Sequence, residues 1–126
     1  MTEGRQEQIS LETLTQSLIN MAVESWRFGR VFDRVLAKLD AGQQSRYKSQ
    51  FRWFLKKIEE SLNEAGLRLV NVEEQPFDPG MAATPLNIEE FEVNDTLIVD
   101  QMLEPTIVGE EGLIKTGTVI LRKDES

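Results

Sequence analysis

The feature that most constrains the fold is a change in the spacing of apolar residues at Gly66. Before Gly66 they recur every three or four positions, as on one face of a helix; after it they come in short runs that alternate with polar residues. Glycine directly behind a helical segment supplies the left-handed residue with which many helices end. We therefore expect an α+β protein, with a helical dimerisation region over residues 1–66 and a small, mostly antiparallel β domain over residues 67–126.

Two helices are predicted in the first half, from about residue 10 to 39 and from about residue 43 to 65, with Ser10 capping the first. Apolar side chains recur every seven residues in the first helix, in a stripe too wide for one neighbour to cover. Two copies of this helical hairpin are therefore expected to pair as a four-helix bundle. The expected dimer interface consists of Leu14, Leu18, Met21, Phe28, Phe32, Phe51, Phe54 and Ile58. The alternative is that the helices pack on the chain's own sheet.

Gly29, Trp53 and the charges of the second helix each lead to a further prediction. Gly29 indicates a close approach or a bend, and Trp53 is expected at the edge of the core. The charges of the second helix run in an order that opposes the helix dipole, so they do not serve helix stability. Basic residues come first and acidic residues last, in the order Lys48, Arg52, Lys56, Lys57, Glu59, Glu60 and Glu64.

The second half reads as short strands separated by turns. Strands are predicted over residues 67–72, 86–93, 96–103, 106–108 and 113–121, the last with a bulge at Gly117. Pro76 and Pro79 stop the first strand, and residues 80–85 are too poor in bulky side chains for a core strand. Residues 122–126 are expected to form a frayed tail.

Composition excludes several classes of function. The chain has no Cys and no His, so a thiolate nucleophile, a histidine base and a zinc site are all ruled out. No phosphate-binding or calcium-binding loop is present, so we expect neither an enzyme nor a bound metal or cofactor. Residues 1–65 carry ten basic and nine acidic residues, and residues 66–126 carry four basic and thirteen acidic residues. The acidic β half argues against binding to nucleic acid, and the polar N-terminus and short apolar runs predict a cytoplasmic protein without a membrane span.

The order of these parts resembles GrpE, the nucleotide exchange factor of DnaK-type chaperones. The passage Phe51–Leu67 is similar to the family's second bundle helix and strand start, and Pro76-Phe77-Asp78-Pro79 is similar to its entry to the β domain. The segments 94–99 and 112–121 resemble two of its later strands. The resemblance covers roughly residues 10–122 and implies a dimeric co-chaperone. Its β domain would bind the ATPase domain of a DnaK-type chaperone and promote ADP release.

The resemblance implies partner contacts near the Asp-Pro turn and on the last hairpin, namely Phe77, Asp78, Met81, Leu86, Glu110, Glu111 and Lys115. The competing interpretation is that Phe77 and Leu86 are core residues and that the charged residues are merely solvated. The chain also departs from the family. Ala82 stands near the family's histidine, Glu104-Pro105 near its Gly-Tyr pair, and residues 111–115 lack its arginine. These departures support an alternative, a non-catalytic adaptor or assembly protein that keeps the scaffold, has lost exchange activity and binds another partner, such as a related ATPase.

Overall fold

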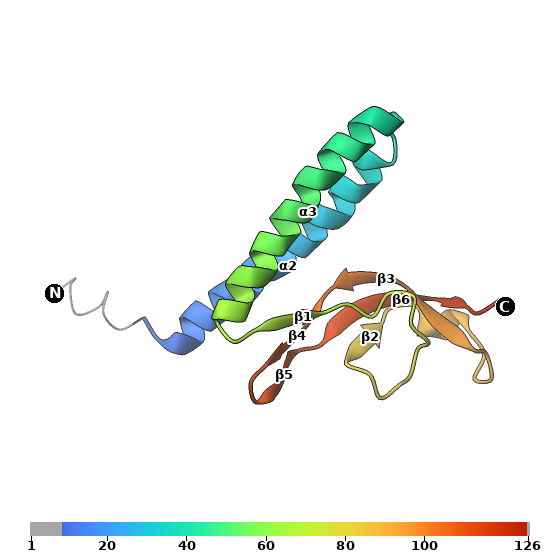
Figure 1. Cartoon of the computed structure of the whole chain (residues 1–126). Helices are drawn as coiled ribbons and strands as arrows, with labels where there is room; N and C mark the ends of the chain where they lie inside the picture. The colour runs from blue at the N-terminus through green and yellow to red at the C-terminus, as the bar shows by residue number, and fades with distance from the viewer. Residues whose placement is uncertain (1–8, 126) are drawn as a thin grey trace.

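The computed structural model describes residues 9–125 and shows a helical hairpin standing on one side of a β domain (Figure 1). In chain order the elements are α2 (Leu11–Leu36), α3 (Ala41–Glu64), β1 (Arg68–Val70), β2 (Ala83–Pro85), the 3₁₀ turn η1 (Ile88–Glu90), β3 (Leu97–Glu104), β4 (Thr106–Gly109), β5 (Gly112–Lys115) and β6 (Gly117–Lys123). The prediction of an α+β chain, two helices followed by a small β domain, is confirmed. The polar N-terminus noted in the sequence lies, over residues 1–8, outside the described residues.

Side-chain caps set where the two helices begin. The Ser10 hydroxyl accepts a hydrogen bond from the Thr13 amide at 3.1 Å, as the sequence predicts for α2. The Asp40 carboxylate accepts one from the Gln43 amide at 2.9 Å, so α3 begins at Ala41, two residues earlier than predicted. The first helix ends at Leu36 rather than near residue 39.

The helical half meets the β half at Gly66, as expected. Its φ of 77° lies in the left-handed region. The Leu67 amide donates to the Leu62 carbonyl at 2.9 Å and the Gly66 amide donates to the Asn63 carbonyl at 3.0 Å, which together make a Schellman motif. Leu62 and Leu67 are both buried in one apolar cluster, so the chain turns sharply from α3 into β1.

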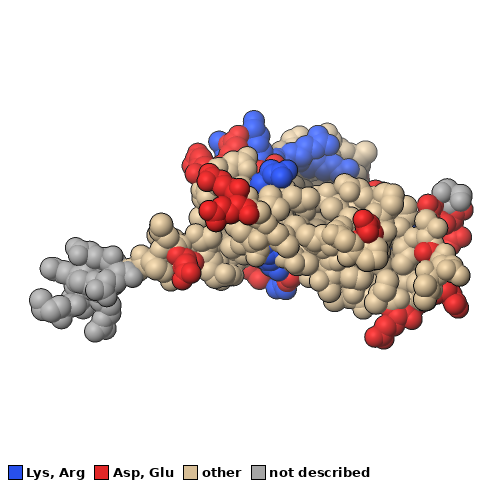
Figure 2. Space-filling view, turned by 90° about the horizontal axis from the view of Figure 1, so that it is seen from below, with Lys and Arg blue, Asp and Glu red and all other residues tan. Residues whose placement is uncertain are grey.

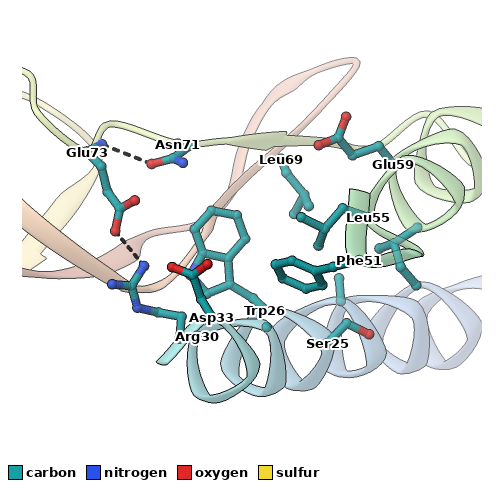
Figure 3. Close-up of a pocket in the computed structure, with 13 residues that line it drawn as sticks. Ser25, Trp26, Arg30, Asp33, Phe51, Leu55, Glu59, Leu69, Asn71 and Glu73 are labelled. Carbon is teal, nitrogen blue, oxygen red and sulfur yellow. Dashed lines mark hydrogen bonds and ion pairs between the residues drawn. The ribbon is translucent and has the colours of Figure 1, made fainter. Parts of the chain in front are cut away.

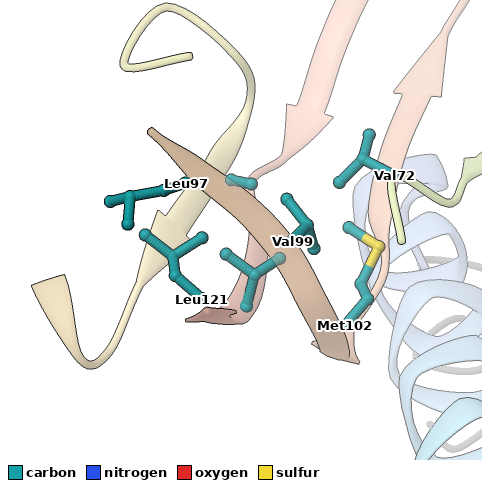
Figure 4. Packing of buried hydrophobic residues seen from close by; sticks show 7 residues of the cluster. Val72, Leu97, Val99, Met102 and Leu121 are labelled. Carbon is teal, nitrogen blue, oxygen red and sulfur yellow. The ribbon is translucent and has the colours of Figure 1, made fainter. Parts of the chain in front are cut away.

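The β domain contains two three-stranded sheets. One has the order β1-β4-β5 and is antiparallel; the other has the order β2-β6-β3, in which β2 runs parallel to β6 and β3 antiparallel to it. The second sheet carries the main apolar core of the domain (Figure 4), which comprises Val72, Ala83, Leu97, Val99, Met102, Val119 and Leu121. A second buried cluster joins the base of the hairpin to β4 through Ile19, Ala22, Val23, Leu62, Leu67 and Ile107.

The prediction of one strand over residues 113–121 is wrong, because the chain passes from one sheet to the other at Gly117. β5 pairs with β4, whereas β6 pairs with β2 and β3. A Cβ atom at Gly117 would lie 2.5 Å from the Met102 methyl carbon and 2.6 Å from the Thr106 hydroxyl. That hydroxyl accepts a hydrogen bond from the Gly117 amide at 3.1 Å and donates one to the Ala82 carbonyl at 2.5 Å. Glycine is therefore needed here for close packing and not for a bulge.

The prediction of a strand over residues 86–93 is also wrong. The segment contains η1 and leaves the side chains of Leu86, Ile88 and Val93 exposed. The side chain of Asn87 takes the place of strand pairing: its amide donates to the Leu121 carbonyl and its oxygen accepts from the Leu121 amide, both at 2.9 Å. The Asn87 side chain thus satisfies both the N–H and the C=O of Leu121 in β6, so no neighbouring strand is needed at that residue.

Two further boundaries differ from the expectation. Residues 83–85, predicted as part of a loop, form β2, and Ala83 is buried against the core because its small side chain fits beside β6. The predicted tail is shorter than expected, because β6 extends through Lys123. Arg122 in this strand forms ion pairs with Glu74 at 2.5 Å and Asp100 at 3.1 Å.

Replacing Gly117 should destabilise the protein. Gly117→Ala places a methyl group against the Met102 side chain and the Glu104 carbonyl, the latter at 3.0 Å, so we expect a loss of about 1–3 kcal/mol in the free energy of unfolding. Gly42→Ala is the matched control. No atom lies closer than 3.5 Å to its Cβ position and it sits within α3, so this change should be neutral or stabilising. Equal loss in both variants, measured by urea denaturation, would contradict the close packing at Gly117.

Candidate functional site

Consecutive turns of α2 fasten the hairpin to the β domain. The Trp26 indole nitrogen donates to the Met102 carbonyl of β3 at 2.7 Å. Arg30 forms an ion pair with Glu73 at 2.5 Å, and the same Glu73 oxygen accepts from the Met102 amide at 2.7 Å. This contact with the sheet fixes which face of α2 is turned toward the β domain.

The predicted contact residues at the Asp-Pro turn divide into buried and exposed members. Phe77 and Met81 are half-buried and pack against the apolar core of the β domain, so they shape the turn from within. Asp78 is exposed, and its carboxylate accepts a hydrogen bond from the Gly80 amide at 3.0 Å, which holds the turn. Asp78 is therefore the most exposed of these three residues.

Leu86 lies in an exposed apolar loop that the sequence did not reveal as such. Its side chain is 61% exposed, and Ile88 and Val93 in the same loop are 42% and 101% exposed. Three large apolar side chains in eight residues, left uncovered by the rest of residues 9–125, are the kind of surface that a protein partner covers. Sequence reasoning placed these residues on a strand and therefore missed the loop.

The second predicted group lies on the β4–β5 turn, in the other sheet. Glu110 and Glu111 are exposed, and Glu110 lies beside the helix end, 3.4 Å from the Cβ position of Gly66. Lys115 is not free: its ammonium group donates to the Glu104 carboxylate at 3.1 Å. The fold thus puts the two predicted groups on different sheets, with the first on the β2–β6–β3 sheet and its loops (Figure 1).

The predicted dimer-interface residues also divide into two sets. Leu18 and Ile58 pack on the cluster at the base of the hairpin, and the rings of Phe32 and Phe51 contact each other with centroids 5.3 Å apart. The Phe32–Phe51 contact joins the two helices to each other. The cluster on which Leu18 and Ile58 pack includes Ile107 of β4, so only these two residues pack toward the chain's own sheet, as in the alternative. The second set is exposed: Leu14 by 50%, Met21 by 66%, Phe28 by 61% and Phe54 by 37%.

The exposed members on α2 form a stripe on the side away from the β domain. Phe28 lies two residues from both Trp26 and Arg30, which is about 200° around a helix of 3.6 residues per turn. Since Trp26 and Arg30 contact the β domain, Phe28 points away from it. Leu14, Met21 and Val35 continue the stripe at intervals of seven. The name outer stripe is used below for Leu14, Met21, Phe28 and Val35.

A cleft of about 290 Å³ lies between the two helices on one side and β1 with the segment that follows it on the other (Figure 3). Its apolar wall includes Trp26, Phe51, Leu55 and Leu69, and its rim carries charged and amide groups from Arg30, Asp33, Glu59, Asn71 and Glu73. Gly29 helps to form it: a Cβ atom there would lie 3.0 Å from the Phe51 ring, so the close approach expected from the sequence is present. The cleft depends on side chains from both halves of the chain, which sequence spacing does not reveal.

Trp53 differs from its expected position at the edge of the core. Its side chain is 62% exposed, and the Lys57 ammonium group lies 5.4 Å from the ring centroid. The Lys57 cation, rather than apolar side chains of the core, therefore covers one face of the Trp53 ring.

Several features that would assign a chemistry are not found within residues 9–125. No group of three or more acidic side chains gathers there in a way that could hold a metal ion. None of the helices in that range has the length and apolar character required to cross a bilayer. Comparisons of the chain with protein-family models, with curated proteins and with solved structures found no match.

The Glu104 carboxylate of β3 interacts with two basic side chains from different parts of the fold. It accepts hydrogen bonds from Lys115 at 3.1 Å and from Arg27 of α2. The bond from Lys115 lowers the pKa of the Glu104 carboxyl below its ordinary value of 4.5, against a smaller opposing effect of burial, and the charge of Arg27 adds to the lowering. One carboxylate therefore links β3 both to β5 and to the hairpin.

The lowered pKa makes a testable contribution to stability. A carboxyl with a lower pKa in the folded state stabilises the fold above its unfolded pKa and loses that contribution as the pH falls through the folded value. Glu104→Gln should therefore reduce the free energy of unfolding by roughly 1–2 kcal/mol at pH 7, with the difference from the parent chain shrinking below about pH 4. Glu89→Gln, an exposed change on η1, is the control and should have little effect at either pH. A difference between Glu104→Gln and the parent that does not vary with pH would contradict the assignment.

Proposed function

We propose that this chain is a GrpE-like cytoplasmic co-chaperone that binds the ATPase domain of a DnaK-type chaperone and promotes ADP release. The observation that carries the proposal is the order and joining of the parts. A helical hairpin ends in a glycine-capped turn and passes directly into a β domain of two sheets, whose first long loop contains Pro76-Phe77-Asp78-Pro79. This is the arrangement on which the resemblance in the sequence rests.

The proposed mechanism needs no catalytic group. A protein that binds the open state of the ATPase domain more tightly than the closed state shifts the equilibrium toward the open state. By reciprocal coupling, the same preference lowers the affinity of the ATPase for ADP. The absence of Cys and His from the chain is consistent with such a binding role.

The exposed loop after β2 is the surface best suited to this contact. Leu86, Ile88 and Val93 are uncovered, and Asp78 is exposed on the preceding turn. Removal of such apolar area from water on binding is favourable by about 25 cal/mol per Å². Phe77 and Met81 would act indirectly, by supporting the turn from the core side.

Release of a fluorescent ADP from a DnaK-type chaperone tests the proposal. The chain should accelerate release, and Leu86→Ser should reduce the acceleration by about tenfold, the effect of losing one exposed anchor at an interface. Trp53→Ser is a matched control, because Trp53 is similarly exposed at 62% but lies on α3, outside both groups of expected partner contacts. The rate of ADP release should therefore change far less in this control variant. If the folded chain does not accelerate release at any concentration, exchange activity is ruled out.

One observation favours the second candidate, a non-catalytic adaptor on a GrpE-like scaffold. Lys115, the only basic residue among the expected contacts, is held by Glu104 and so is not free to pair with a partner. Exposed Glu110 and Glu111 stand on the same hairpin. A partner with a basic surface, such as a related ATPase, would suit this end of the β domain. Binding to the chaperone without faster ADP release, or capture of another ATPase, would favour this candidate.

We also propose that the chain forms a homodimer through the outer stripe and Phe54. An apolar row that runs along nearly the whole of α2 and is about half exposed at every position is costly to leave in water. A second hairpin laid on this face would complete a four-helix bundle.

Light scattering tests the dimer. The parent chain should have twice the monomer mass of 14.4 kDa, whereas Phe28→Glu should shift it toward the monomer, because a charge would be buried in the middle of the stripe. Asn20→Asp, an added charge on the same helix outside the stripe, should leave the dimer intact. A parent chain that stays monomeric at all concentrations would contradict the bundle.

A further inference from the structure

The cleft between the hairpin and the β domain contains charged groups that the fold does not use. Four charged side chains line it: Arg30, Asp33, Glu59 and Glu73. Arg30 and Glu73 pair with each other at 2.5 Å, and Glu73 also accepts a hydrogen bond from the Met102 amide. The side chains of Asp33 and Glu59 are exposed and form no ion pair or hydrogen bond with any other residue of the range 9–125. Two carboxylates of the lining are therefore left without a cation.

Asp33 and Glu59 stand at opposite ends of the cleft (Figure 3). Gly29 of α2 faces Phe51 of α3, since a Cβ atom on Gly29 would lie 3.0 Å from the Phe51 ring. Asp33 follows Gly29 by one helical turn, about 6 Å toward the connection between the helices, and Glu59 follows Phe51 by about 12 Å in the opposite direction. Helical side chains lean toward the start of their own helix, so in this antiparallel hairpin the two carboxylates lean toward each other.

The wall between the two carboxylates is apolar. Trp26, Phe51, Leu55 and Leu69 line it, and the Trp26 side chain also packs against the core of the β domain. Aromatic faces attract cations as well as apolar groups. The cleft volume of about 290 Å³ lies just below the usual range for small-molecule pockets, so a slender ligand would fill it. Along its length the cleft is thus negative, then apolar, then negative.

The two carboxylates lie in surroundings of different charge. Residues 11–26 and 58–66, at the base of the hairpin, carry five acidic residues and no basic one, whereas residues 27–57 carry nine basic residues and two acidic ones. Figure 2 shows acidic side chains gathered on the helical part nearer the N-terminus and basic side chains further along it. Glu59 belongs to the acidic base. Asp33 belongs to the basic part, where the other acidic residue, Asp40, caps α3. Glu59 should therefore attract a cation more strongly than Asp33 does.

We propose that the cleft binds a slender aliphatic amine with a positive charge at each end, that is, a linear diamine or polyamine. One ammonium group donates to the Asp33 carboxylate and the other to the Glu59 carboxylate. The methylene chain between them lies along the rings of Trp26 and Phe51. The proposal does not depend on exchange activity or on the dimer, because the outer stripe lies on the opposite side of α2 from the β domain.

Other classes of ligand fit the cleft less well. Among the described residues that line it, Arg30 is the only basic one, and its pairing with Glu73 leaves little to attract an anion. A divalent metal ion needs several oxygen ligands gathered in one place, whereas Asp33 and Glu59 lie at opposite ends. A neutral apolar ligand would leave both carboxylates without a partner.

The bound amine would contact both halves of the chain. Asp33, Phe51 and Glu59 belong to the helices, whereas Leu69 belongs to β1. A ligand held between the two halves binds the folded chain and not the unfolded one, so the melting temperature should rise with its concentration. This gives a readout of binding that needs no label.

Three compounds with the same eight-carbon chain test the charge pattern. In a Trp53→Phe chain, Trp26 is the only tryptophan, so its fluorescence reports events in the cleft. The linear eight-carbon diamine should bind about fivefold more tightly than octylamine, which carries one charge instead of two. Suberate, the eight-carbon dicarboxylate, should not bind. The four-carbon diamine should bind more weakly than the eight-carbon one, because it is too short to reach both carboxylates.

Removing either carboxylate should abolish the advantage of the second charge. In Glu59→Gln and in Asp33→Asn the diamine should bind about threefold to fivefold more weakly, with the larger loss in Glu59→Gln, whereas the affinity for octylamine should change less. Glu60→Gln is the matched control. Glu60 is an exposed carboxylate on α3 next to Glu59 but does not line the cleft, so this change should leave the affinities for both amines nearly unaltered.

Several results would overturn the proposal. Equal affinities for the diamine and octylamine, or binding of suberate, would show that the cleft does not select two positive charges. A diamine affinity unchanged when Asp33→Asn and Glu59→Gln are combined would place the amine elsewhere on the chain. Absence of saturable binding by the diamine up to millimolar concentrations would rule out the site. ADP release and molecular mass are measured separately, so none of these results is confused with a failure of exchange activity or of the dimer.

Discussion

The contact of α2 with β3 is the interaction on which the rest of the structure depends. Trp26 places an apolar ring against the core of the β domain and satisfies its own indole N–H on the Met102 carbonyl, so burial costs no unpaired donor. Glu73 receives both the Arg30 guanidinium and the Met102 amide, which couples the ion pair to the backbone of the strand. Without this contact the hairpin would touch the β domain only at its base. With it, the rotation of α2 about its own axis is fixed, and so is the face that carries the outer stripe.

The two halves of the chain therefore offer different kinds of surface. The β domain is acidic and exposes a short apolar loop with Leu86, Ile88 and Val93, which suits a partner bound through a few anchoring side chains. The hairpin offers the outer stripe, a row of four exposed apolar side chains along α2, which is the surface proposed above to pair with a second copy. The Glu104 carboxylate touches both regions, because it holds Lys115 on the β4–β5 hairpin and Arg27 on α2.

Local pattern was enough to predict the helices, the turn at Gly66 and the long strand β3, because each depends on residues close together in the chain. It failed where a distant residue decides the structure. Asn87 replaces a strand by bonding to Leu121, and Gly117 changes sheets because Met102 and Thr106 leave no room for a side chain. For the candidate site, the heptad pattern identified the apolar residues of α2 but could not tell which of them are buried within the chain and which stay exposed. Leu18 serves the chain's own core, whereas Met21 and Phe28 remain exposed, and only the position of the β domain decides which.

The Schellman turn at Gly66 has a mechanical consequence. Only Ala65, Gly66 and Leu67 separate α3 from β1. Leu67 is buried against Leu62 in the preceding helical turn, so this connection is too short and too well packed to act as a flexible linker. A second fastening at Trp26, farther along the hairpin, prevents rotation about that joint. The hairpin and the β domain then behave as a single rigid lever. A force applied at the exposed loop would be transmitted to the helices, and any reorientation of the β domain would have to be accompanied by movement of the whole hairpin.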